Sequence, residues 1–152
     1  MLYSLDTSAL LDGWRDWYPP DSFPSLWDKI VNSINIGDLR AVDEVEKELS
    51  QRHDDIYRWV KSNSNLIIPM SEDIFNSASK IEQQFSSLVK QGSSKSRGDP
   101  FVIALAIVHN LTVITGEKQG TREHPRIPFV CSHYGIKCTN MPGFIREQGW
   151  TF

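Results

Sequence analysis

The stretch DPFVIALAIVHNLTVITGEK, residues 99–118, carries the strongest fold signals in the chain. Residues 101–108 are apolar on nearly every side of a helix, which predicts a central helix covered by several neighbours. Asp99 is expected to cap this helix, with Pro100 at its first position. The run LTVIT, residues 111–115, is rich in β-branched residues and is the clearest predicted strand, and the turn GEKQGT ends it.

Alternating helices and strands continue on both sides of this unit. Further strands are predicted at LYSL, LRAV and IKC, and NLIIPM is either a short strand or a buried connection. Apolar residues at helical spacing predict helices after Ser8 and over residues 23–36, 44–63 and 71–89, the last capped by Ser71. IPFVCSHYG is expected to form a short helix. We expect one domain over residues 1–152, an α/β fold of three α/β/α layers around a mostly parallel sheet.

Composition favours a cytoplasmic protein with no membrane span. The chain has 152 residues and a formal net charge of −3, which argues against a globally basic nucleic-acid binder but permits a local basic patch. No basic cluster precedes an apolar stretch in the first residues and no apolar run approaches about 20 residues, so we expect neither a secretory signal nor a membrane span. Cys131 and Cys138 are expected to be reduced, and their spacing from His124 and His133 does not favour a zinc site.

Three acidic residues are predicted to meet at the carboxyl edge of the sheet. Asp6 follows the first strand, and Glu117 follows the strand 111–115. Asp99 begins the helix that returns into that same strand, so it lies level with the strand's carboxyl end. Glu44 and Glu48 share a helix face, and either one could complete the set; we prefer Glu48.

Such a cluster has a physical use. Unpaired carboxylates repel one another, raise each other's pKa values and destabilise the fold, and a hard divalent cation removes that cost. Oxygen ligands favour Mg²⁺ or Mn²⁺ over zinc, and such ions activate water and stabilise the leaving oxygen of a phosphodiester. Taken singly, Asp99 also reads as a helix cap, Glu44 and Glu48 as solvated residues, and Glu117 as part of a turn.

The residues YSLDTSALL, VEKEL, GDPFVIALA and VITGEK resemble, in order and spacing, the four acidic motifs of PIN-domain ribonucleases. This family includes the toxins of VapBC-type bacterial toxin–antitoxin pairs. The segment IPFVCSHYGIKC resembles the tail of a poorly characterised PIN-like branch. The resemblance spans nearly the whole chain, and it implies a Mg²⁺- or Mn²⁺-dependent endoribonuclease on a parallel α/β/α fold.

The resemblance also implies roles for individual residues. Asp6, Glu48 and Asp99 match the family's first aspartate, helix glutamate and second aspartate, which are metal ligands. Glu117 stands where the family usually has a fourth aspartate, which is also a metal ligand, and its side chain is longer than the usual one. Ser8 and Thr115 resemble the hydroxyl residues that help to hold the first acid and bound water.

Basic and aromatic residues near these motifs are candidates for RNA contacts. Lys95, Arg97 and Lys118 flank two of the motifs and are placed to hold phosphates, although each also reads as a solvated loop charge. Trp14 and Trp17 follow the first motif, where they either stack on bases or pack in the core or against a partner.

Three functions fit the sequence. The first is a metal-dependent endoribonuclease that acts as a toxin. A cognate antitoxin would then cover the acids at the carboxyl edge of the sheet, and the toxin could form a homodimer. The second is a PIN-like module that has lost turnover and binds RNA or protein. The third is a phosphatase with Asp6 as nucleophile, which is disfavoured because Ser8 stands where a second acid is usual.

Overall fold

A computed structural model describes residues 1–52, 54–89 and 98–152. Its centre is a sheet in the order β3-β2-β1-β4-β5, in which every strand pair is parallel. The strands are β1 (Tyr3–Leu5), β2 (Leu39–Val42), β3 (Ile67–Ile68), β4 (Thr112–Ile114) and β5 (Cys138–Thr139). The predicted α/β fold with a mostly parallel sheet is therefore confirmed, and NLIIPM contributes a strand.

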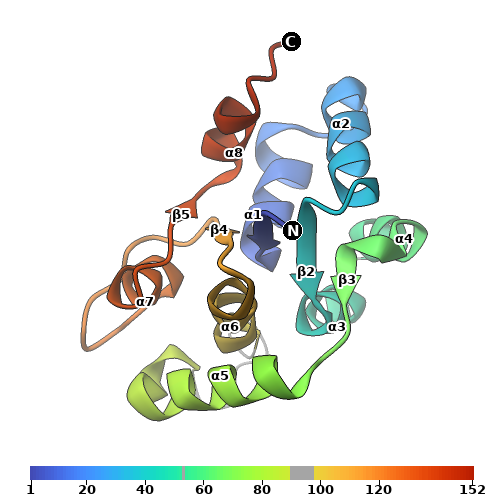
Figure 1. The fold of residues 1–152 in the computed structure, drawn as a ribbon. Helices are drawn as coiled ribbons and strands as arrows, with labels where there is room; N and C mark the ends of the chain where they lie inside the picture. The colour runs from blue at the N-terminus through green and yellow to red at the C-terminus, as the bar shows by residue number, and fades with distance from the viewer. Residues whose placement is uncertain (53, 90–97) are drawn as a thin grey trace.

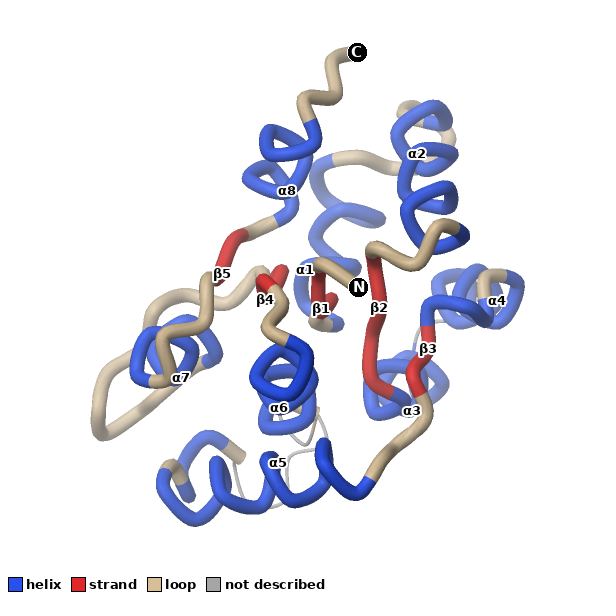
Figure 2. The backbone as a smooth tube through the Cα atoms, viewed as in Figure 1, coloured by secondary structure: helices blue, strands red, loops and turns tan. Residues whose placement is uncertain are grey.

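Helices cover both faces of this sheet. Figures 1 and 2 show α5 and α6 on one side of the row of strands and α1, α2 and α8 on the other. The helices are α1 (Thr7–Leu11), α2 (Pro24–Asn35), α3 (Asp43–Arg52), α4 (Asp54–Ser62), α5 (Glu72–Gln84), α6 (Asp99–His109), α7 (Ile127–His133) and α8 (Met141–Gln148). A π-helical segment, Asp12–Trp17, continues from α1.

The core is built around α6, as its uniform apolar sequence predicts. Residues 102–106 of this helix are at most 1% exposed, and α6 contacts β1, β2 and β4. Asn110 adopts the left-handed conformation, with φ of 55°, and so turns the chain from α6 into β4. The hydroxyl of Ser4 in β1 donates to the carbonyl of Val102 at 2.9 Å, which ties the strand to this helix.

Three predicted helix boundaries are wrong. Gly98 rather than Asp99 is the N-cap of α6, so Asp99 is the first helical residue and Pro100 follows it. The region 44–63 forms two helices, α3 and α4, which pack on each other. Helix α5 ends at Gln84, and a 3₁₀ turn, Ser86–Leu88, follows it. The apolar spacing continues across the breaks after α3 and α5 because the segments before and after each break bury residues in the same core.

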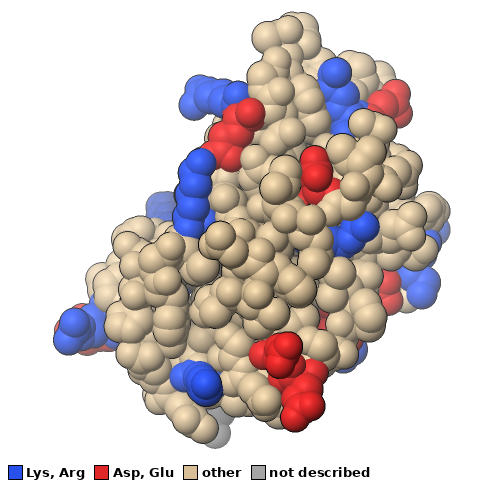
Figure 3. All heavy atoms as spheres, in the orientation of Figure 1, with Lys and Arg blue, Asp and Glu red and all other residues tan. Residues whose placement is uncertain are grey.

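The surface combines charges of both signs. Figure 3 shows Lys and Arg side chains scattered among Asp and Glu on the face in view. Within the described residues, no helix is long and apolar enough to cross a membrane.

The burial of α6 predicts unequal costs for the same substitution at two leucines. Leu105→Ala removes a side chain with no exposed surface and is expected to lower the free energy of unfolding by about 2–5 kcal/mol. Leu2→Ala, at a residue 54% exposed, is expected to change it by less than about 1 kcal/mol. Urea denaturation measures both values, and equal costs would contradict the central position of α6.

Candidate functional site

Asp6 lies at the carboxyl end of β1, where two hydroxyls hold its carboxylate. Ser8 and Thr115 both donate to Oδ2 of Asp6, Thr115 at 2.9 Å. The Ser8 hydroxyl in turn accepts from the amide of Gly116 at 2.9 Å. Asp6 is 4% exposed, and burial raises its pKa although the two hydroxyls oppose that shift. The hydroxyls therefore fix the position of this acid between β1 and the end of β4.

Glu48 reaches the same edge from α3. Its Oε1 accepts from the amide of Gly98, the residue before Asp99, at 3.1 Å. Burial, followed by the negative charge of Asp6, raises the pKa of Glu48 to about 7. Glu44, in contrast, pairs with Lys47 at 3.1 Å. Of the two glutamates, Glu48 is thus the one bound to the segment that carries Asp99.

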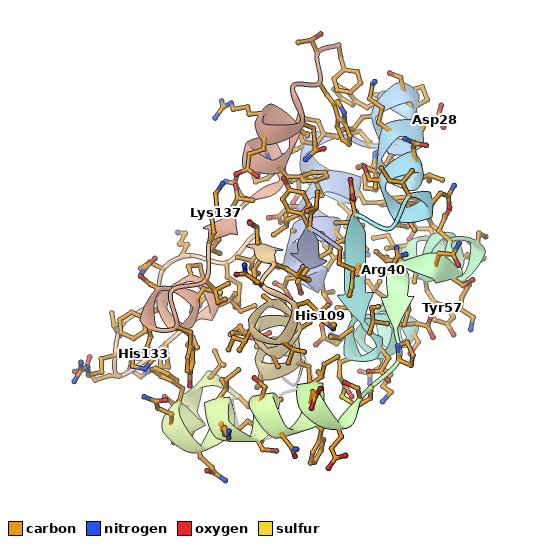
Figure 4. All side chains as sticks on the ribbon, viewed as in Figure 1. Asp28, Arg40, Tyr57, His109, His133 and Lys137 are labelled. Carbon is orange, nitrogen blue, oxygen red and sulfur yellow. The ribbon has the colours of Figure 1, made fainter. Side chains whose placement is uncertain are left out.

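Asp99 lies at the start of α6 and is 6% exposed. Figure 4 labels His109 at the opposite end of this helix. Burial raises the pKa of Asp99 well above its ordinary value, and the negative charges of Asp6, Glu117 and Glu48 add to the shift. The carboxyl of Asp99 is therefore close enough to the other three predicted acids for their negative charges to raise its pKa.

Glu117 approaches from the loop after β4. Its amide donates to the hydroxyl of Thr115 at 3.1 Å. Its Oε1 is buried and has no hydrogen-bond partner among the described residues. Burial and the charge of Asp6 raise the pKa of Glu117 to about 7, whereas the guanidinium of Arg126 acts in the opposite direction.

The structure thus brings the four predicted acids together from four separate segments. Their shared electrostatic signature is a raised pKa, caused first by burial in every case. Within residues 1–52, 54–89 and 98–152, no three His, Cys, Asp or Glu side chains are already arranged as a metal-binding group. All four side chains nevertheless offer carboxylate oxygens, the donors that Mg²⁺ and Mn²⁺ favour.

Sequence reasoning missed a fifth acid at this edge. Asp12 begins the π-helical segment one turn after Ser8, and its carboxylate lies against Gly116. Burial raises the pKa of Asp12, and the charges of Asp16 and Asp6 raise it further. The i, i+4 spacing of Ser8 and Asp12 was a signal that both face the same way.

The residues predicted to contact RNA have different environments. Lys118 is exposed next to Glu117, while Lys95 and Arg97 lie outside the described residues. Trp14 packs edge-on against Trp27, with ring centroids 5.0 Å apart, and its indole donates to Asp55 at 3.0 Å. Trp17 is 43% exposed. Trp14 is therefore a packing residue in this structure, and Trp17 is the more accessible ring.

The cysteines and histidine near the end of the chain have other partners. Cys131 and Cys138 are free thiols. Their mutual hydrogen bond and burial raise the pKa of Cys131. The ring of His133 lies 2.9 Å from the side-chain amide of Gln84.

Comparison with solved structures supports a PIN-like fold. The chain is similar to FitAcB from Neisseria gonorrhoeae, with 15% identity, a TM-score of 0.54, and coverage of 91% of this chain and 97% of the other. It is also similar to VapBC2 from Rickettsia felis bound to a promoter DNA fragment, with 14% identity, a TM-score of 0.53, and coverage of 92% and 98%.

A third similar structure is FitAB bound to the IR36 DNA fragment, with 15% identity, a TM-score of 0.54, and coverage of 91% and 94%. No curated protein sequence matches the chain. The family described as "Domain of unknown function (DUF4411)" matches residues 3–152. The chain therefore belongs to the DUF4411 family.

Proposed function

We propose that this chain is a Mg²⁺- or Mn²⁺-dependent endoribonuclease and the toxin of a bacterial toxin–antitoxin pair. The observation that carries the proposal is the convergence of Asp6, Glu48, Asp99 and Glu117 at one edge of the sheet, with all four pKa values raised. Buried like charges destabilise a fold, so a ligand that neutralises them is the simplest reason for their presence.

The donor set fits a hard divalent cation. Asp6 and Asp99 would hold the principal ion, with Glu48 and Glu117 contributing directly or through water. The buried Oε1 of Glu117 has no partner within the described part of the chain and is free for such a role. A bound ion of this kind supplies a Lewis acid that activates water and stabilises the leaving oxygen.

The remaining steps belong to the side chains. Glu48 and Glu117 lie within the electrostatic reach of Asp6, and one of them is proposed to take a proton from the attacking water. Ser8 and Thr115 keep Asp6 in place through their hydroxyls. Exposed Lys118, together with Lys95 and Arg97 of the sequence, is proposed to hold RNA phosphates.

The toxin assignment rests on the resemblance of the four acidic motifs to those of PIN-domain toxins, and the similar folds of the FitAB and VapBC2 structures support it. We propose that a cognate antitoxin covers the carboxylates of the four acids. We also propose a homodimer, as is common among PIN-domain toxins. The predicted location is the cytoplasm.

Neutralising single acids should abolish cleavage. Purified wild-type chain is expected to cut total RNA with Mn²⁺ or Mg²⁺ and not with EDTA. Asp6→Asn and Asp99→Asn should be inactive because each removes a carboxylate of the cluster. Asp28→Asn is the matched control, since Asp28 is exposed on α2 (Figure 4). Gel electrophoresis or sequencing of RNA ends measures the result.

The same variants separate the enzyme from a binding module. If wild type and both variants are equally inert on RNA, and Asp6→Asn still inhibits growth when expressed in a bacterial host, the ribonuclease proposal fails. That result would favour a module acting through RNA or protein contact.

The raised pKa values predict how metal and pH affect stability. Glu48 has its pKa raised from 4.5 to about 7, so its contribution to stability is complete below pH 4.5 and is lost as the pH rises through 7. In EDTA, the melting temperature should therefore fall between pH 5 and pH 8. Added Mn²⁺ should raise it more at pH 8 than at pH 5.

The Asp99→Asn variant tests whether the acidic cluster causes these changes in melting temperature. Because the pKa of Asp99 is raised in the fold, folding at pH 8 requires this carboxyl to take up a proton, and asparagine removes that cost. Asp99→Asn should therefore raise the metal-free melting temperature at pH 8 and reduce the shift produced by Mn²⁺, whereas Asp28→Asn should alter neither. An equal Mn²⁺ shift in Asp99→Asn and wild type would show that the ion binds elsewhere.

Thr115 is a positioning residue whose hydroxyl connects Asp6 to the amide of Glu117. Thr115→Val should lower the cleavage rate by about 10- to 100-fold, in line with the loss of groups that orient metal ligands. Thr115→Ser keeps the hydroxyl and should restore most of the activity. Single-turnover rates of the two variants measure this, and equal rates in both would rule out a role for the hydroxyl.

A further inference from the structure

A groove extends toward β5 from the edge of the sheet where Asp6, Glu48, Asp99 and Glu117 meet, which we call the acidic edge. It encloses about 550 Å³ between the loop after β4, helix α7 and the end of β5, and Thr115 and Glu117 of the acidic site form one end of it. Its remaining walls include Gln119, Pro128, Ser132, Ile136 and Asn140. Because β4 and β5 are parallel neighbours, their carboxyl ends place this groove directly beside the acids.

Polar groups in the groove are left without protein partners. Within the described parts of the chain, the side chains of Gln119 and Ser132 form no hydrogen bond, and both residues are exposed. The side-chain oxygen Oδ1 of Asn140 caps α8 by accepting from the amide of Gly143 at 2.9 Å, and the side-chain nitrogen of Asn140 forms no hydrogen bond with any described residue. These groups are available to a ligand.

The chemistry of the lining favours a neutral ligand that offers hydrogen-bond donors and acceptors. Glu117 is the one charged residue among the described residues that line the groove, and it belongs to the acidic site. Pro128 and Ile136 add apolar surface, while the carboxamides and the hydroxyl offer donors and acceptors. Unstacked RNA bases are recognised through such contacts to their hydrogen-bonding edges.

We propose that this groove binds the nucleoside next to the scissile phosphate of a single-stranded RNA, with Gln119 and Ser132 contacting the base edge. This assignment rests on the proposed ribonuclease function and names a subsite for its substrate. A phosphate at the acids places the adjoining nucleoside at Glu117, which is the shared end of the two regions. The groove thus acts as a specificity site, and the acids perform the cleavage.

The test measures RNA binding apart from cleavage. The Asp99→Asn chain, which is expected not to cut, is titrated with a fluorescein-labelled single-stranded RNA of random sequence, and anisotropy gives the affinity. Ser132→Trp fills the groove and Gln119→Ala removes one carboxamide, each in the Asp99→Asn background. We expect Ser132→Trp to weaken binding about 10-fold and Gln119→Ala by a smaller factor.

Ser87→Trp is the matched control. Ser87 is also an exposed serine, and it lines a separate cavity of about 490 Å³ with Phe129 and His133 of α7. This substitution should leave the affinity within about twofold of the parent value. In the cleaving wild-type background, Ser132→Trp and Gln119→Ala should also change which nucleotide is preferred at the cut.

Two results would overturn the subsite. The first is unchanged affinity and unchanged nucleotide preference in both groove variants, which would leave the groove to a partner protein. The second is an equal loss of affinity in Ser87→Trp. If the loss of affinity is confined to the groove variants but the wild-type chain cuts no RNA, the groove binds RNA and the nuclease proposal alone is rejected.

Discussion

The burial of several carboxylates beside Asp6 is the constraint on which the rest of this structure depends. Desolvation is the largest cause of the raised pKa at each of the four acids, and their mutual repulsion adds to it at Glu48, Asp99 and Glu117. A fold keeps such a cost only where the surrounding structure holds the groups in place. Here the hydroxyls of Ser8 and Thr115 hold the first acid.

The scaffold explains why residues so distant in sequence meet. Parallel strands β1 and β4 end at the same edge, so Asp6 and Glu117 emerge side by side. Helix α6 runs from that edge to the far one and returns through Asn110, which places Asp99 level with both strand ends. The same geometry extends past β4 to β5, so a neutral polar groove adjoins a charged cluster.

Much of this could be predicted from particular residues. Helix α6 and strand β4 were evident because uniform burial leaves an unambiguous apolar run, and Asp6, Asp99 and Glu117 followed from strand and helix ends. Two features were not evident. The separation of α3 from α4 lies within one continuous helical pattern. Asp12 reaches the edge because it lies one helical turn after Ser8, and apolar spacing does not point to a polar position of this kind. The groove is formed by residues from three segments that lie apart in the sequence, and its proposed role rests on polar side chains without protein partners. The sequence alone shows neither feature.

The four acids are proposed to form one cation site. A crystal of the wild-type chain soaked in Mn²⁺ and measured at a wavelength where manganese scatters anomalously would locate the ion. We expect an anomalous peak bounded by the carboxylates of Asp6 and Asp99, and we expect it to disappear in an Asp6→Asn crystal grown in the same form. A well-occupied peak elsewhere, or none at this edge in a soak that labels other carboxylates, would contradict it.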